Sequence, residues 1–292
     1  MELLVQQVTA GLATGAIYAC VALAIVMIYR AIGHVNFAQG EMAMVSTYLA
    51  WQLIEFGLPY WLAFVLTLVL SFVLGAMVQH LLIRRIRSAS DINQIIVFIG
   101  VLLVLNSVAG FIWSYTVKPF PSPFGTTPFM GSPLASAHQV GMIGVILVVL
   151  LLLFLFFRFT RTGLAMRAAV SNPNSARLLG IRVKALEALG WGMAASIGAI
   201  AGILVAPIVF LEPNMMAGIV IYGFAGAVLG GLNSLLGALI GGLLLGVLEN
   251  LISTFVPVVG GELKSTIALI AIVVVLLVRP QGLIGKPTTH RV

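Results

Sequence analysis

The chain has 292 residues, of which 61% are apolar and only 8% are charged. Soluble domains carry about 25% charged residues, so this composition excludes a soluble protein, and the unbroken apolar runs 145–157 and 267–278 exclude a β-barrel, whose strands alternate. A net charge of +7 is compatible with nucleic-acid binding. In so apolar a chain, however, basic residues mark cytoplasmic loops, and we expect membrane lipid rather than nucleic acid around the protein.

Apolar stretches of membrane-spanning length follow one another along the whole chain. A helix needs about 20 apolar residues to cross a bilayer. The predicted spans are 8–30, 41–56, 60–83, 92–113, 139–157, 187–211, 215–232, 234–256 and 264–278. No linker is long enough to divide the chain. The sequence therefore predicts an all-α, polytopic transmembrane helix bundle of about eight or nine spans, forming a single domain over residues 1–292.

Lysine and arginine are unevenly divided between the two sides of these spans. If the span that ends at Arg30 finishes in the cytoplasm and the others alternate, 13 of the 15 basic residues are cytoplasmic and only Lys118 and Lys264 are outside. Such an excess is the positive-inside signal. It predicts an N-terminus outside the cell and a cytoplasmic C-terminus.

Glycines recur at intervals of four residues in several spans. This spacing of small residues lets helix backbones approach closely in lipid, and it predicts a tightly packed bundle. The pairs are Gly11/Gly15, Gly226/Gly230, Gly237/Gly241 and Gly242/Gly246.

Residues 30–44, RAIGHVNFAQGEMAM, interrupt the apolar pattern between the first two spans. Non-helical backbone at membrane depth occurs only where it is buried in protein or lines a cavity, and broken helices of this kind recur at transport sites. The stretch is therefore either a helix break near a translocation path or a short interfacial turn. No second histidine or cysteine stands at ligand spacing from His34, so we expect no metal site.

Glu249 stands well inside the eighth predicted span. An ionisable residue at mid-bilayer costs about 2.5–3.5 kcal/mol on insertion scales and needs a reason to be there. Two explanations remain open from the sequence, a buried structural hydrogen bond and a role in the translocation path.

The segment 158–186 carries six lysines and arginines and is the most basic loop of the chain. Residues 163–170 suit a short helix. Asn172 and Pro173 are then a good N-cap and first helical residue for a second helix, which Gly180 ends. The loop is therefore either a docking element outside the bilayer or a basic retention loop without a partner.

Four stretches together resemble one family over almost the whole chain. TGLAMRAAVSNPNSARLLGI (162–181), IGHVNFAQGEM (32–42), GAVLGGLNSLLGALIGGLLLGVLEN (226–250) and LVRPQGLIG (277–285) are similar to segments of the LivH-type permeases of branched-chain amino acid ABC importers. The resemblance implies a type II-like importer permease in the inner membrane. Its implied partners are a second, LivM-like permease, two ATP-binding subunits and a periplasmic substrate-binding protein.

The resemblance also assigns roles to residues. A segment that docks on the ATPase would contain Gly163, Arg167, Ala168, Asn172, Ala176, Leu179, Gly180 and Ile181. The broken-helix region near the path would contain Asn36, Phe37, Gln39 and Gly40, and Glu249 is a further candidate for the path.

The chain has no phosphate-binding loop of its own. Its nearest approach, GLIGKPTT at 282–289, has the wrong glycine spacing and a proline after the lysine. We therefore expect no catalytic residue and no bound cofactor, with magnesium-ATP used by the partner subunits. The alternatives are a gradient-driven secondary transporter or a channel for a small solute, or an ABC permease for urea or short amides.

Overall fold

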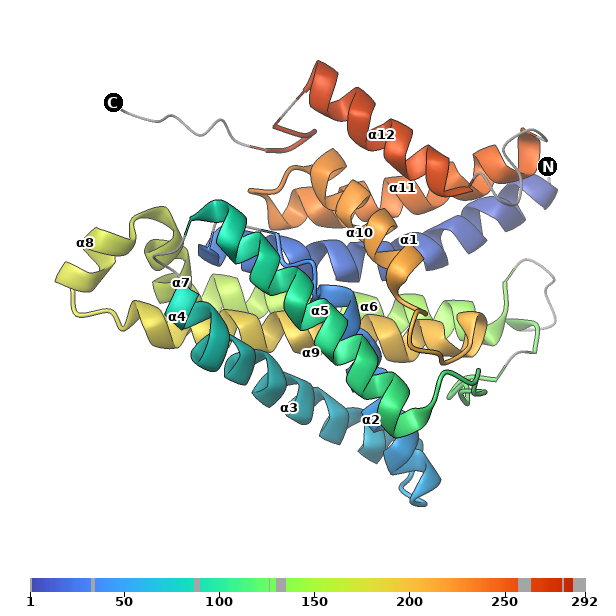
Figure 1. Ribbon diagram of the computed structural model, residues 1–292. Helices are drawn as coiled ribbons and strands as arrows, with labels where there is room; N and C mark the ends of the chain where they lie inside the picture. The colour runs from blue at the N-terminus through green and yellow to red at the C-terminus, as the bar shows by residue number, and fades with distance from the viewer. Residues whose placement is uncertain are drawn as a thin grey trace.

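The computed structural model describes residues 2–32, 35–86, 90–125, 127–129, 135–256, 264–279 and 281–285. Within these ranges the chain is helical apart from turns and two isolated backbone bridges, as the composition predicts. The helices (Figure 1) are α1 (Glu2–Ile32), α2 (Gln39–Glu55), α3 (Tyr60–Val78), the π-helical turn η1 (Gln79–Ile83), α4 (Arg84–Ile86), α5 (Asp91–Trp113), α6 (Ala137–Phe159), α7 (Arg161–Ser171), α8 (Pro173–Leu178), α9 (Val183–Val209), α10 (Ala217–Gly230), α11 (Leu235–Phe255) and α12 (Lys264–Val278).

Each predicted span coincides with a helix, but the helices differ in length. In the described part of the chain, six are long and apolar enough to cross a bilayer: α1, the continuous rod formed by α3, η1 and α4, and α5, α6, α9 and α11. The helices α2, α10 and α12 have only 17, 14 and 15 residues. At 1.5 Å per residue α10 is about 21 Å long. This is shorter than the hydrocarbon core of a bilayer, which is about 30 Å thick. A crossing at α10 therefore needs additional non-helical residues, and these must be buried in protein or line a cavity.

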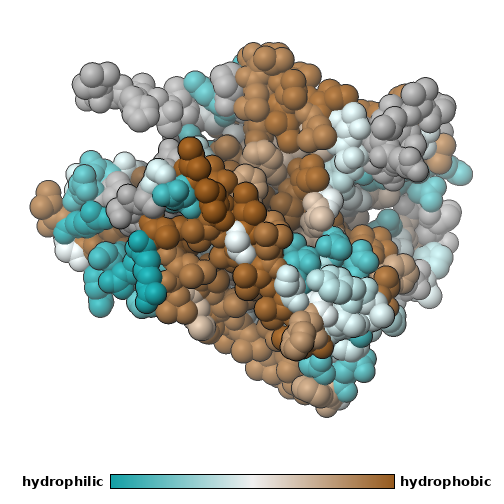
Figure 2. Space-filling view, viewed as in Figure 1, coloured by the Kyte–Doolittle hydropathy of each residue, from teal (hydrophilic) through white to brown (hydrophobic). Residues whose placement is uncertain are grey.

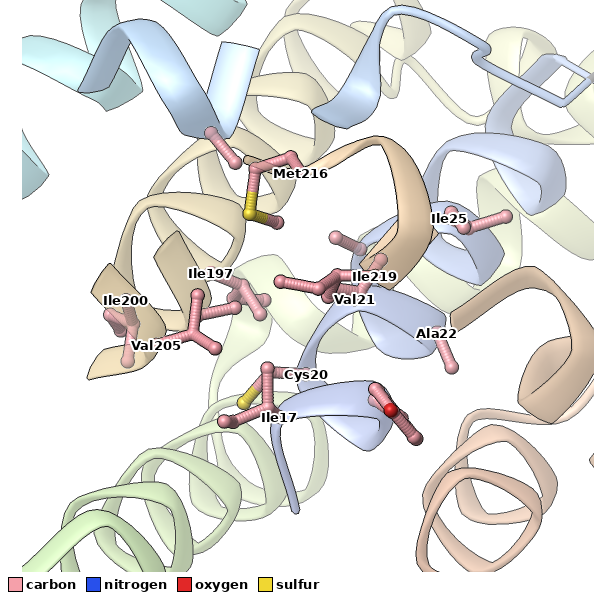
Figure 3. Packing of buried hydrophobic residues seen from close by; sticks show 14 of the residues in the cluster. Ile17, Cys20, Val21, Ala22, Ile25, Ile197, Ile200, Val205, Met216 and Ile219 are labelled. Carbon is pink, nitrogen blue, oxygen red and sulfur yellow. The ribbon is translucent and has the colours of Figure 1, made fainter. Parts of the chain in front are cut away.

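Helix α1 forms the centre of the bundle. Of its most apolar stretch, 89% is buried, because α9, α10 and α11 pack around it. Figure 3 shows Val21 of α1 lying with Ile219 of α10 and Ile197 of α9 in the core. A helix that is apolar on every side can be buried in this way without leaving a polar face in contact with neighbours.

Helices α1 and α11 approach each other through their glycines. A Cβ atom added to Gly242 would lie 2.5 Å from the Cα atom of Ala19, and one added to Gly15 would lie 2.9 Å from the Cα atom of Leu243. Both distances are to backbone, which a rotamer change cannot relieve. The four-residue glycine spacing therefore gives the close helix packing that it predicts.

The two ends of the bundle differ in charge. In Figure 1, α4, α7 and α8 lie at one end and the N-terminus of α1 at the other. At the first end, Arg84 of α4 shares a groove with Arg177, Arg182 and Lys184, although these residues are far apart in sequence. The two basic loops of the sequence thus lie on the same side.

We expect Gly242→Val to destabilise the protein, because the added carbon atoms meet the backbone of α1. Overpacking of this kind costs about 1–3 kcal/mol. Gly144→Val in α6 is the matched control, since nothing lies within 4 Å of a Cβ atom there. Melting temperatures in detergent should fall for the first variant and not for the second; equal melting would contradict the tight α1–α11 contact.

Candidate functional site

The basic loop folds into a helical hairpin, α7 and α8, as its cap signals predict. The Thr160 hydroxyl accepts a hydrogen bond from the Gly163 N–H (2.9 Å) and begins α7. The Asn172 side chain accepts one from the Ser175 N–H (3.0 Å) and begins α8. Gly180 follows α8 with φ +77°, a conformation that favours glycine. The hairpin projects from the end of the bundle (Figure 1).

The structure does not bring the expected coupling residues onto one surface. Gly163 is buried against the backbone of Phe156, at the corner between α6 and α7. Ala176 is buried in a small cluster with Ala169 and Val183, which fixes the hairpin to the start of α9. Ile181 is half-buried, whereas the remaining predicted residues are exposed: Arg167, Ala168, Asn172, Leu179 and Gly180.

The tip of the hairpin carries an apolar pair that the sequence analysis named only in part. Leu178 is 90% exposed and Leu179 beside it is 79% exposed. Adjacent exposed leucines on a projecting element are typical of a protein contact surface. The sequence feature that could have predicted this surface is the pair of leucines directly before Gly180, the residue expected to end the helix.

Arg167 points away from that tip, towards the bundle. It lines a cavity of about 290 Å³ with Arg158 and with apolar residues of α1, α6 and α11. A smaller, adjoining hollow is lined by both Arg30 and Arg167. Their guanidinium groups are close enough for the two positive charges to repel each other. Arg167 therefore belongs to a basic rim at the end of the bundle rather than to the projecting surface.

The described residues between α1 and α2, 35–38, are non-helical and form a turn in which the Gln39 N–H donates to the Asn36 carbonyl (3.3 Å). Gly33 and His34 fall outside the described residues, and the rest of the break is ordered by short contacts. The Asn36 side-chain oxygen accepts a hydrogen bond from the Ala38 N–H (3.0 Å), and the Gln39 amide donates to the Ala194 carbonyl (3.1 Å).

Ala194 is in the middle third of α9, so α2 begins near the centre of the bundle. Gly40 sits where a Cβ atom would lie 2.5 Å from Val220 of α10. Asn36 and Gln39 are buried, whereas Phe37 is 43% exposed. The start of α2 is therefore packed inside the bundle against α9 and α10. Its role in the translocation path stays a prediction.

Glu249 is held between three helices. Its carboxylate accepts a hydrogen bond from the Tyr18 hydroxyl (2.7 Å) across the α1–α11 contact. The Tyr18 ring stacks on Tyr222 of α10, with the ring centroids 4.7 Å apart. The structural hydrogen bond that the sequence left open is therefore present, and a role of Glu249 in transport stays a prediction.

These features define a class of protein: a multi-span helical membrane protein with a break between α1 and α2 and a helical hairpin, α7 and α8, that projects from one end of the bundle. The family model described as the permease component of branched-chain amino acid transport systems matches residues 7–276. The chain belongs to this family.

Individual proteins of the family match over nearly the whole chain. The high-affinity branched-chain amino acid transport system permease protein LivH of Escherichia coli (strain K12) is 32% identical, over 98% of this chain and 97% of its own length. The permease protein BraD of Pseudomonas aeruginosa is 30% identical over the same shares. Among solved structures, PsaBC from Streptococcus pneumoniae in complex with Fab matches with a TM-score of 0.51 at 15% identity, covering 93% of this chain and 91% of that one, which indicates a shared fold.

We expect Phe37→Cys to react with a water-soluble maleimide roughly tenfold or more faster than Ala38→Cys, because thiol reactivity requires access. Phe37 is 43% exposed and Ala38 1%. Both variants are made in a Cys20→Ala background, which removes the single, buried cysteine. Mass spectrometry of the purified chain follows the labelling, and equal rates would contradict the structure of the break.

We expect Tyr18→Phe to lower the free energy of unfolding by about 1–3 kcal/mol, because it removes a donor from a buried carboxylate. Tyr29→Phe, on the same helix and with no hydrogen-bond partner for its hydroxyl among the described residues, is the control. Glu249→Gln keeps an acceptor for Tyr18 and should remain close to wild type in stability. Detergent unfolding measures all three. A loss of transport by Glu249→Gln at unchanged stability would support the path role instead.

Proposed function

We propose that this chain is the membrane-spanning permease subunit of an ABC importer that carries branched-chain amino acids across the inner membrane. The proposal is supported by the family match over residues 7–276 and by the branched-chain amino acid permeases LivH and BraD, which align over nearly the full chain. The role assigned is that of a transporter subunit, not of an enzyme.

The partners we propose are a second, LivM-like permease, two ATP-binding subunits that use magnesium-ATP, and a periplasmic binding protein, in a type II-like arrangement. The observation that carries this proposal is the projecting hairpin with Leu178 and Leu179 exposed at its tip. A gradient-driven carrier or a channel has no need for such a surface. The apolar pair is suited to fill a groove on a soluble subunit, and the basic residues around it provide electrostatic placement.

The proposed orientation has the N-terminus outside and the C-terminus in the cytoplasm. It is supported by the basic groove at the hairpin end of the bundle, formed by Arg84, Arg177, Arg182 and Lys184. Residues 281–285 lie at the same end as the C-terminus of α10, because the Leu283 N–H donates to the Leu229 carbonyl (2.8 Å).

The α7–α8 hairpin contacts two helices of the bundle, α6 and α9, so a movement of the hairpin can be transmitted to both. Gly163 packs α7 against the end of α6, and Ala176 with Val183 packs α8 against the start of α9. Further along α9, the Ala194 carbonyl binds Gln39 at the start of α2. Closure of the ATP-binding subunits would therefore displace α6 and α9 as rigid elements and shift the break between α1 and α2. A transported ligand needs only to favour one of the two states by its differential affinity.

The test is uptake of radiolabelled leucine by the complex reconstituted in proteoliposomes with ATP inside. The variant Leu178→Asp with Leu179→Asp should lose most of its copurifying ATP-binding subunits and most of its uptake, because two charges replace the apolar tip. The exchange Leu178→Met with Leu179→Met should retain both.

Ala168→Trp, at an exposed position of α7, should also impair coupling. Three outcomes would overturn the proposal. They are uptake that follows an ion gradient without ATP, uptake of urea or short amides but not of leucine, and unchanged recovery of ATP-binding subunits with the aspartate variant.

A further inference from the structure

A second polar site lies where α2, α5 and the turn before α10 meet. The Asn106 side-chain amide of α5 donates to the Glu41 carboxylate of α2 (3.3 Å). The same nitrogen lies 3.1 Å from the Pro213 carbonyl oxygen and 3.2 Å from the side-chain oxygen of Asn214. Glu41 is only 8% exposed, although it is the third residue of α2, close to the break before that helix. We call Glu41, Asn106 and Asn214 the Glu41 site.

The Glu41 site has more hydrogen-bond acceptors than donors. One amide NH₂ group has two hydrogens, and here it faces three acceptor oxygens. Among the described residues, the second carboxylate oxygen of Glu41 accepts no side-chain hydrogen bond, and no lysine or arginine forms an ion pair with this residue. Burial of a carboxylate without a cationic partner is costly, so the site is complementary to a group that brings both positive charge and N–H donors.

A buried hydroxyl further along α2 also lacks a partner. Tyr48, two turns from Glu41, is completely buried, and its hydroxyl has no hydrogen bond within the described part of the chain. Its ring stacks on Trp113 of α5 with the centroids 4.9 Å apart, which fixes the side chain. The contact between α2 and α5 that holds the Glu41 site thus has a second unsatisfied polar group two turns away.

One side of the Glu41 site is at the surface. Asn214, Ala217 and Gly218 are exposed, and there is open space where a Cβ atom of Gly218 would stand. In Figure 2 a hydrophilic patch interrupts the brown surface over the turn that leads into α10, beside α5. The acceptor supplied by Asn214 therefore lies on an exposed turn, next to the buried Glu41 carboxylate.

We propose that the Glu41 site binds the primary ammonium group of the transported amino acid, with Glu41 as its anionic partner. This inference rests on the proposed function and assigns a contact residue for its substrate. The ammonium group brings three N–H donors and one positive charge, which matches the surplus acceptors and the unpaired carboxylate. Asn106 orients the Glu41 carboxylate, and the side-chain oxygen of Asn214 supplies a further acceptor.

The first measurement is binding of leucine to the purified complex without its binding protein, by saturation-transfer NMR. The second probe is 4-methylpentanoate, which has the same side chain and carboxylate but no ammonium group. Wild type should give a signal with leucine and little with 4-methylpentanoate. Glu41→Gln, which removes the charge at nearly constant volume, should reduce the leucine signal to that of the deaminated analogue. Glu55→Gln is the matched control, because Glu55 is exposed at the far end of the same helix.

The second measurement is leucine uptake in proteoliposomes beside ATP hydrolysis stimulated by the loaded binding protein. Glu41→Gln should reduce uptake roughly tenfold, since hydrogen bonds to charged groups contribute more than neutral ones, while stimulated hydrolysis and melting temperature stay near wild type. Glu41→Asp should recover part of the uptake. Asn214→Ala, at an exposed position that folding does not need, should reduce uptake roughly threefold, as expected for one neutral hydrogen bond.

The outcomes separate the two proposals. If wild type takes up leucine and Glu41→Gln binds and transports it equally well, the ammonium site is wrong and the importer function stands. If Glu41→Gln lowers stability and ATP hydrolysis together with uptake, and Asn214→Ala has no effect, Glu41 is only structural and the inference is overturned. If the wild-type complex neither binds nor takes up leucine, both proposals fail.

Discussion

The backbone contact between α1 and α11 is the constraint on which the rest of the bundle depends. Lipid tails are as apolar as leucine, so helices in a bilayer are held together by close packing and by hydrogen bonds rather than by exclusion from water. Gly15 and Gly242 allow the two backbones to meet, and the contact brings the Tyr18 hydroxyl to the Glu249 carboxylate. With α1 fixed in this way, α9 and α10 pack on its remaining faces.

Helix α9 connects the two regions to which we assign a role in transport. It begins in the cluster that holds the α7–α8 hairpin and continues past Gln39 at the start of α2. At Gly202, a side chain would collide with Thr47 of α2, so the two helices stay in register over several turns. A rigid helix that packs against both the hairpin and the start of α2 moves the two together. This gives a physical basis for coupling the hairpin to the break without an unbroken chain of polar contacts.

The polar groups inside the bundle are few, and each described above stands where separate elements meet. Glu249 joins α1 to α11, Gln39 joins α2 to α9, and Glu41 joins α2 to α5. Gln39 and Glu41 lie within three residues of each other at the broken helix. Because such groups are costly in a membrane unless they are satisfied, their concentration at the break distinguishes this place from ordinary helix packing.

The sequence alone determined the helical class, the positions of the spans and the two helices of the hairpin, because hydropathy, cap residues and glycine spacing act over a few residues. It also indicated that residues 30–44 are unusual. Only the tertiary structure decided that α2 begins inside the bundle against α9, that Gly163 faces inward while Leu178 faces outward, and that Arg167 points towards the bundle. Asn106 is 65 residues from Glu41 along the chain and 108 residues from Asn214. Helices that are apolar all round have no periodicity to show which face turns inward, so pairings at this distance follow from packing and not from local pattern.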